Sequence, residues 1–262
     1  MENIGDRLYT IVDYTRGELF SQGKMAQLTY QAFDWYVDKI QNSEDEEITV
    51  SYPIGYKPSK ETMLSEIVFT KDEIKQEYQF LGLTQLPING IYKLVTLIET
   101  MLLEILKAVV LKYPKKLGSK RQIDIATVLS SDSILEIQLN VINKLLNELA
   151  YKSPEEFVKE FENITSINLF ETSVSHRYKE IKATRDIYIH NMGVVNEIYI
   201  KKADSHARAK LGQHLPIDIQ YFLESYEYCL QLCEFLEIKL HEIWPSQKYE
   251  KANAKEETEI TT

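Results

Sequence analysis

Three residue types that interrupt or cross-link a chain are scarce in this sequence. Its 262 residues include 9 glycines, 7 prolines and 2 cysteines. Because glycine and proline mark most turns, their scarcity predicts few turns and long elements, which favours helices. Apolar residues make up 44% of the chain and charged residues 27%, a balance that predicts a buried core.

The sequence also lacks the signs of secretion or membrane insertion. Cys229 and Cys233 lie four residues apart on one face of a predicted helix, where they are poorly placed to form a disulfide bond with each other. The first seven residues have neither the basic region nor the apolar stretch of a signal peptide. The most apolar stretch, residues 94–111, contains two glutamates and a lysine, which is typical of a core helix. We therefore expect a cytoplasmic protein that makes no membrane contact.

Several familiar catalytic and metal-binding motifs are absent. There is no phosphate-binding G-x-x-x-x-G-K-[ST] loop, no G-x-G-x-x-G and no G-x-S-x-G elbow. The patterns H-E-x-x-H, E-x-x-H and paired C-x-x-C are absent too. We therefore expect neither a metal ion nor another cofactor.

Charge is distributed unevenly along a chain whose net charge is −10 at pH 7. An acidic chain does not favour non-specific binding to nucleic acid, because such binding depends on neutralising phosphates. Residues 176–214 nevertheless carry eight basic and four acidic residues, a local charge of +4, together with four of the five histidines. This window is either a chance cluster of charges or a surface that faces an anion.

Apolar periodicity and capping signals predict long helices and one extended segment. Residues 4–42 have helical spacing with a break near Gly23, and residues 48–53 and 67–69 are candidate partners in a short β-hairpin. A helix that begins after residue 172 is predicted to stop at Gly193, a candidate left-handed cap. Other helix starts are predicted at Thr70, Asn89, Asp132, Ser153 and Pro216.

These signals predict a mainly all-α fold with three parts. Residues 1–85 are interpreted as an N-terminal helical and extended segment, and residues 86–245 as a helical domain. Residues 246–262 are rich in lysine, glutamate and threonine and have few apolar residues, so we expect a disordered tail.

One segment inside the basic window carries a pattern of chemical interest. It reads Arg185-Asp186, three mostly apolar residues, His190-Asn191, and then Gly193. This pattern resembles the R-x4-6-H motif of the HEPN superfamily, helical domains found in many metal-independent endoribonucleases of bacterial stress and phage-defence systems. The resemblance covers residues 91–244 and implies a HEPN-like helical bundle that forms symmetric dimers with a composite cleft.

The spacing of the motif is not specific by itself. Arg208 and His214 satisfy it as well, but they lie in a stretch rich in lysine and arginine, whereas Arg185 follows a well-patterned helix. A purely structural alternative also stays open: Arg185 pairs with Asp186 or with another acid nearby, and His190 caps its own helix.

Residue chemistry suggests how such a pair would cleave RNA. Attack by the 2′-OH needs a base, an acid for the leaving 5′-oxygen and stabilisation of phosphorane charge. A guanidinium fork such as that of Arg185 suits a phosphate, and a histidine such as His190 can transfer protons near neutral pH. We expect these two residues to be catalytic.

Supporting roles fall to neighbours of the pair. Asp186 is placed to fix Arg185, and Asn191 to bind the phosphate or to orient His190. Three lysines of the basic window are candidate RNA contacts, namely Lys182, Lys201 and Lys202. Glu99 resembles the acid that some HEPN domains place near the cleft, but its position on the polar edge of an apolar helix predicts a solvated charge instead.

Helix geometry places a constraint on the pair. Five residues along an α-helix correspond to a rise of about 7.5 Å and a rotation of about 140°. Arg185 and His190 therefore reach one phosphate only if the helix ends between them or if a second subunit completes the site.

Three functions are compatible with the sequence. The first is a HEPN-type ribonuclease that acts as a homodimer, as a toxin or antiphage effector with RNA as substrate and an antitoxin or regulatory protein as partner. The second is an inactive HEPN-like module that binds a partner protein or RNA. The third is a helical scaffold whose basic window docks another protein.

Overall fold

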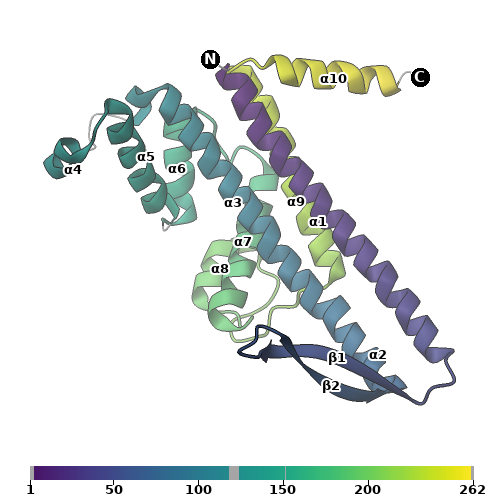
Figure 1. The fold of residues 1–262 in the computed structure, drawn as a ribbon. Helices are drawn as coiled ribbons and strands as arrows, with labels where there is room; N and C mark the ends of the chain where they lie inside the picture. The colour runs from purple at the N-terminus through teal and green to yellow at the C-terminus, as the bar shows by residue number, and fades with distance from the viewer. Residues whose placement is uncertain (1–2, 118–123, 151, 261–262) are drawn as a thin grey trace.

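The computed structural model describes residues 3–117, 124–150 and 152–260. It is mainly α-helical with one β-hairpin, which confirms the predicted fold class (Figure 1). The helices and strands are α1 Ile4–Gln41, β1 Glu47–Tyr56, β2 Thr62–Thr70, α2 Lys71–Phe80, α3 Leu86–Lys112, α4 Ile125–Ser130, α5 Ile134–Ala150, α6 Pro154–Thr165, α7 Ser173–Asn191, α8 Glu197–Ala203, α9 Ile219–Ile243 and α10 Gln247–Ile260.

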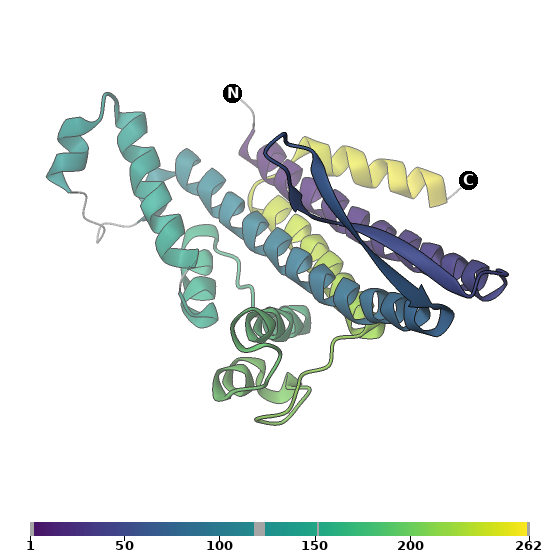
Figure 2. The same cartoon turned by 60° about the horizontal axis from the view of Figure 1, so that its bottom comes forward.

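Three long helices, α1, α3 and α9, lie side by side and form the centre of the core (Figures 1 and 2). Leu8 and Val12 of α1 are fully buried in one cluster with Ile98 and Ile105 of α3 and Leu236 of α9. The N-terminal helix is therefore part of the same core as residues 86–245, and not an addition beside it. The reason is its own apolar spacing, which gives α1 a buried face from Ile4 to Ala26 for the other two helices.

The predicted break near Gly23 is wrong, because α1 is continuous from Ile4 to Gln41. A Cβ atom on Gly23 would lie 3.0 Å from the ring of Tyr226 on α9. The glycine therefore permits close packing of two helices, which costs some helix propensity but does not end the helix.

The β-hairpin is present with the predicted pairing. Ile48 lies opposite Phe69 and Val50 opposite Ile67 in an antiparallel register, and the strands extend beyond the predicted residues to a loop at positions 57–61. The hairpin leads into α2, which lies at one end of the long helices (Figure 1). Thr70 caps α2 through a reciprocal pair of hydrogen bonds with Glu73, as predicted.

Helix α3 begins earlier than expected. It starts at Leu86, not at Asn89, and a π-helical turn at Leu81–Gln85 joins it to α2. Gly90 lies inside the helix, where a Cβ atom would be 2.4 Å from Cε2 of Phe222 on α9. Here again the glycine serves packing between helices and does not start a new element.

Beyond α9 the structure replaces the predicted disordered tail with α10. Asp6 on α1 accepts hydrogen bonds from the Ser246 hydroxyl at 2.7 Å and from the Lys248 backbone at 3.1 Å. The ring of Tyr249 packs on His241, with centroids 4.4 Å apart. These contacts with α1 and α9 hold the start of α10, which composition alone does not reveal. Residues 261–262 lie outside the described part of the chain.

No helix in the described ranges 3–117, 124–150 and 152–260 combines the length and apolar character needed to cross a membrane.

Candidate functional site

Helix α7 carries the predicted catalytic pair and packs against α3, α8 and α9. Its buried side chains include Ile181, Thr184 and Ile187, which fix the helix in place. The predicted boundaries are confirmed, since the helix runs from Ser173 to Asn191. Because the helix does not end between Arg185 and His190, the rise and rotation of a continuous helix separate the two side chains.

Arg185 points inward and meets an acid from α3. Its Nη2 donates to Oε2 of Glu99 at 2.8 Å, and the side chain is only 18% exposed. Lys182, one turn earlier, donates to the other oxygen of the same carboxylate. The prediction of a solvated charge at Glu99 is therefore wrong, because this carboxylate joins α3 to two cations of α7.

Asp186 is the second acid beside the arginine, as predicted. Its Oδ1 lies 3.3 Å from Nε of Arg185, and its Oδ2 accepts from Nζ of Lys202 on α8 at 3.0 Å. The Arg185 Nε itself makes no hydrogen bond within the described residues. Lys182, Arg185 and Lys202 thus form one cluster with two carboxylates, while Lys201 is exposed.

The end of α7 places His190 apart from this cluster. His190 is exposed in the last turn of the helix. The Asn191 amide donates to the Val194 carbonyl and so closes the turn that follows. Met192 takes the left-handed cap position with φ of 49°, and Gly193 follows with φ of +77°. The left-handed stop predicted at glycine therefore spans both residues.

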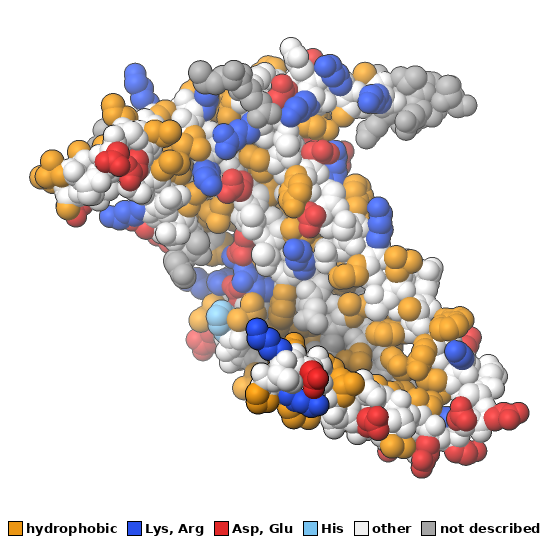
Figure 3. All heavy atoms as spheres, in the orientation of Figure 1, with side chains coloured by type: hydrophobic (Ala, Val, Ile, Leu, Met, Phe, Trp, Pro, Cys, Tyr) orange, Lys and Arg blue, Asp and Glu red, His pale blue; other side chains and the backbone are white. Residues whose placement is uncertain are grey.

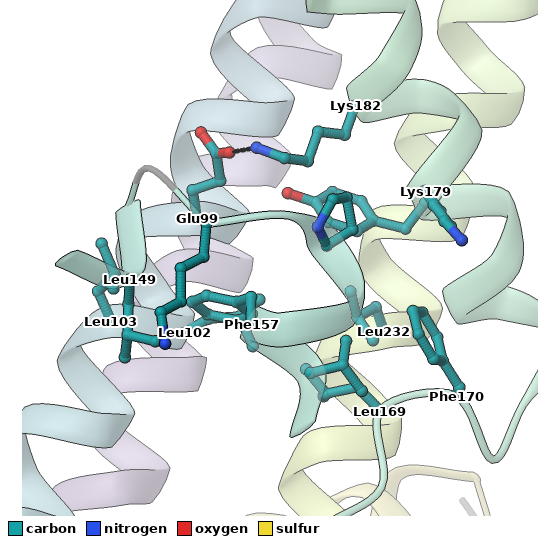
Figure 4. A pocket seen from close by; sticks show the side chains of 14 residues that line it. Glu99, Leu102, Leu103, Leu149, Phe157, Leu169, Phe170, Lys179, Lys182 and Leu232 are labelled. Atoms are coloured by element: carbon teal, nitrogen blue, oxygen red, sulfur yellow. Dashed lines mark hydrogen bonds and ion pairs between the residues drawn. The ribbon is translucent and has the colours of Figure 1, made fainter. Parts of the chain in front are cut away.

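An apolar pocket of about 140 Å³ opens beside Glu99 and Lys182. Figure 4 shows these two side chains meeting at one end of the pocket, with leucine and phenylalanine side chains along the rest of it. Its labelled apolar lining consists of Leu102, Leu103, Leu149, Phe157, Leu169, Phe170 and Leu232.

Burial changes the chemistry of Lys182. Loss of solvent lowers the pKa of Lys182 to about 8, because the charged form is less well solvated there. The neighbouring cations Arg185 and Lys202 lower it further, and the carboxylate of Asp186 acts in the opposite direction.

The second match to the motif has a different role. Arg208 donates through Nε to Oε1 of the buried Glu180 at 3.1 Å and stacks 3.4 Å from the ring centroid of Tyr221. His214 packs edge-on against Tyr188 with centroids 5.7 Å apart. Arg208 is therefore a structural partner of a buried acid, while Arg185 lies in the cluster that borders the pocket.

Sequence reasoning underestimated Glu99 and missed the pocket. The available signal was an acid at position 99 within an otherwise apolar stretch, because a charge on such a helix needs a cation or solvent. The pocket itself is formed by α3, α5, α6, α7, the loop before α7 and α9 together, so no local pattern reports it.

The cluster supplies cationic donors for an anion, whereas His190, the group that can transfer protons, lies apart from it. Glu99 accepts one of the five N–H donors of Arg185 and the Nε donor is buried, which leaves at most three donors for a phosphate. Comparisons with family models, with curated proteins and with solved structures gave no match to this chain.

Proposed function

We propose that this protein is a HEPN-type endoribonuclease that acts as a homodimer and cleaves RNA without a metal ion. The proposal rests on the motif resemblance and on one structural observation. Arg185 is held in a set orientation by Glu99 and Asp186, and an exposed histidine lies five residues later on the same helix. A fixed guanidinium and an accessible proton-transfer group are the two elements that this chemistry needs.

The two groups have separate roles in this proposal. Arg185 binds the scissile phosphate and stabilises the charge of the phosphorane, for which a rigid fork is suited. His190 accepts the proton of the attacking 2′-OH and then donates it to the leaving 5′-oxygen, which requires the solvent access that it has. Lys201 and Lys202 attract the RNA backbone. DNA lacks the attacking hydroxyl and resists cleavage.

The direction of the side chains supports the proposed dimer. Along continuous α7 the two residues diverge by about 140°, and Arg185 faces α3 while His190 is exposed. A two-fold axis near the end of α7 would bring His190 of one copy to Arg185 of the other. In this arrangement each cleft takes one group from each subunit.

The proposed biological role is that of a toxin or antiphage effector, restrained by an antitoxin or regulatory protein. This part rests on the family resemblance. Induced expression of the wild-type chain should arrest bacterial growth, and expression of His190→Ala should not.

The direct test is incubation of the purified protein with cellular RNA in EDTA, followed by end-group analysis. We expect fragments with 2′,3′-cyclic phosphate and 5′-OH ends, and no cleavage by Arg185→Ala or His190→Ala. His176→Ala and Arg177→Ala are matched controls at the start of the same helix, and they should retain activity. Cleavage that persists in both site variants would show a contaminating nuclease and would contradict the proposal.

A second function, an inactive module that binds a partner, is favoured by a specific observation. Large apolar side chains remain exposed on α4 and at the start of α5, where Figure 3 shows them gathered on one surface. Ile125 is 72% exposed, Leu129 81% and Ile134 76%. Large apolar side chains exposed close together in this way are typical of a protein interaction site. Intact RNA with all variants, together with loss of partner capture in Leu129→Asp, would favour this function.

A further inference from the structure

We propose that the pocket beside Glu99 and Lys182 binds a small anion with an apolar body, namely a carboxylate carried on roughly six to eight carbon atoms. The pocket shares Glu99 with the cluster that holds Arg185, but binding of this anion does not depend on the ribonuclease function. It rests on the volume of the pocket, on its lining and on the charges at its border.

The volume sets the size of the occupant. The pocket holds about 140 Å³, and an apolar cavity of about 150 Å³ is enough for a benzene molecule. A short hydrocarbon chain or a single ring therefore fits, whereas a long lipid chain does not.

The lining sets the polarity of the occupant. Nine of the fourteen lining residues are leucine, phenylalanine, valine or proline. The one tyrosine in the lining, Tyr178, is buried and directs its hydroxyl to the Val95 carbonyl at 3.4 Å. A nucleobase would bring polar edges to this wall, where burial without hydrogen bonds carries a free-energy cost. The wall therefore favours a hydrocarbon over a base.

The border sets the charge of the occupant. The residues around the pocket include three lysines and one glutamate, and a second glutamate outside the lining pairs with one of the lysines, which leaves one positive charge in excess. Lys179 is paired with Glu155 at 2.6 Å, and Lys182 shares Glu99 with Arg185. Because the cluster of Lys182, Arg185 and Lys202 has three cations and two carboxylates, a further carboxylate placed next to Lys182 would be attracted to it.

Figure 4 shows how these features combine. Lys182 and Glu99 meet at one end of the pocket, and the apolar side chains Leu103, Leu149 and Phe157 lie away from them. An occupant with its head group at the lysine therefore has its hydrocarbon part against the leucines. Partial desolvation of Lys182, which lowers its pKa, also strengthens its attraction to a bound anion.

The test is isothermal titration calorimetry of the full-length protein at pH 7 with octanoate, octanamide and octylammonium. We expect octanoate to bind at least ten times more tightly than the neutral amide, since a charge-assisted hydrogen bond is worth about 1.5–3 kcal/mol. Octylammonium should not bind. Octanoate and octanamide of equal affinity, or no binding of octanoate at millimolar concentration, would overturn the proposal.

Two variants locate the site. Lys182→Gln should weaken octanoate binding about tenfold or more, while Lys93→Gln on the exposed face of α3 should leave it unchanged. Val158→Trp should fill the pocket and abolish binding. Circular dichroism checks the fold of each variant. If Lys182→Gln does not fold, the difference in affinity between octanoate and octanamide for the wild-type protein tests the proposal. The proposal would be refuted if adenosine monophosphate binds, Val158→Trp abolishes that binding, and octanoate does not bind. The pocket would then be a site for a base.

Discussion

The proposed composite active site makes a quantitative prediction for mixed dimers. Arg185→Ala and His190→Ala are each expected to be inactive as homodimers. In a heterodimer of the two variants, one cleft lacks both groups and the other has Arg185 from one copy and His190 from the other. Random assembly of equal amounts makes half of the dimers heterodimers, so the mixture should regain about one quarter of wild-type activity.

The geometry of α7 is the reason to expect a site shared between two subunits. Because the helix is continuous through Asn191, a rise of about 7.5 Å and a rotation of about 140° separate the two residues within one chain. A site within one subunit would leave every chain of the mixture defective, and no activity would return. The activity of the mixture therefore distinguishes the two arrangements: about one quarter of the wild-type value for a shared site, and none for a site within one subunit.

The assay is co-expression of the two variants with different affinity tags and sequential purification on both tags. The purified heterodimer should cleave RNA in EDTA at about half the wild-type rate per dimer, because one of its two clefts is complete. A folded heterodimer without activity, or a chain that never co-purifies with its second copy, would refute the reasoning about a shared cleft.

Other predictions concern packing, a buried charge and pH. Gly90→Ala should lower the free energy of unfolding by about 1–3 kcal/mol, because its Cβ would clash with Phe222, whereas Gly17→Ala, which has no neighbour within 4 Å, should raise it by about 0.5–1 kcal/mol. Urea denaturation of this matched pair measures both values, and equal effects would contradict the packing. Glu180→Ala should lower the free energy of unfolding by about 3–5 kcal/mol, since it removes the carboxylate that pairs with Arg208 and accepts from the buried hydroxyls of Tyr199 and Tyr221, and an effect below 1 kcal/mol in the same assay would be inconsistent with that network. Octanoate affinity should fall as pH rises through about 8, because Lys182 then loses the proton that attracts the anion while the ligand stays charged, and calorimetry at pH 6.5 and 9.5 checks this.

Local signals determined much of this fold. The capping boxes at Thr70 and Ser153 mark the starts of α2 and α6 as predicted, because each depends on residues only three positions apart. The predicted pairing of residues 48–53 with 67–69 is also confirmed. These features could be read from the sequence because the interacting groups are close along the chain.

The role of Gly23 and the structure of the C-terminal tail could not be predicted from local patterns. Gly23 is compatible with a break or with close packing, and only the position of Tyr226 on α9 decides between them. The tail was expected to be disordered from its composition, yet Asp6, about 240 positions earlier, holds Ser246. In each case the deciding partner comes from a distant segment.

The candidate site also has features that local sequence determines and features that depend on distant segments. The sequence by itself determined that Arg185 and His190 lie on one helix with a left-handed stop after them, since periodicity and glycine report helix ends. Only the tertiary structure decided that Glu99, 86 positions before Arg185, holds that arginine and borders an apolar pocket. The physical reason is that ion pairs and cavities form between elements that pack together, and the packing of distant helices depends on the whole core.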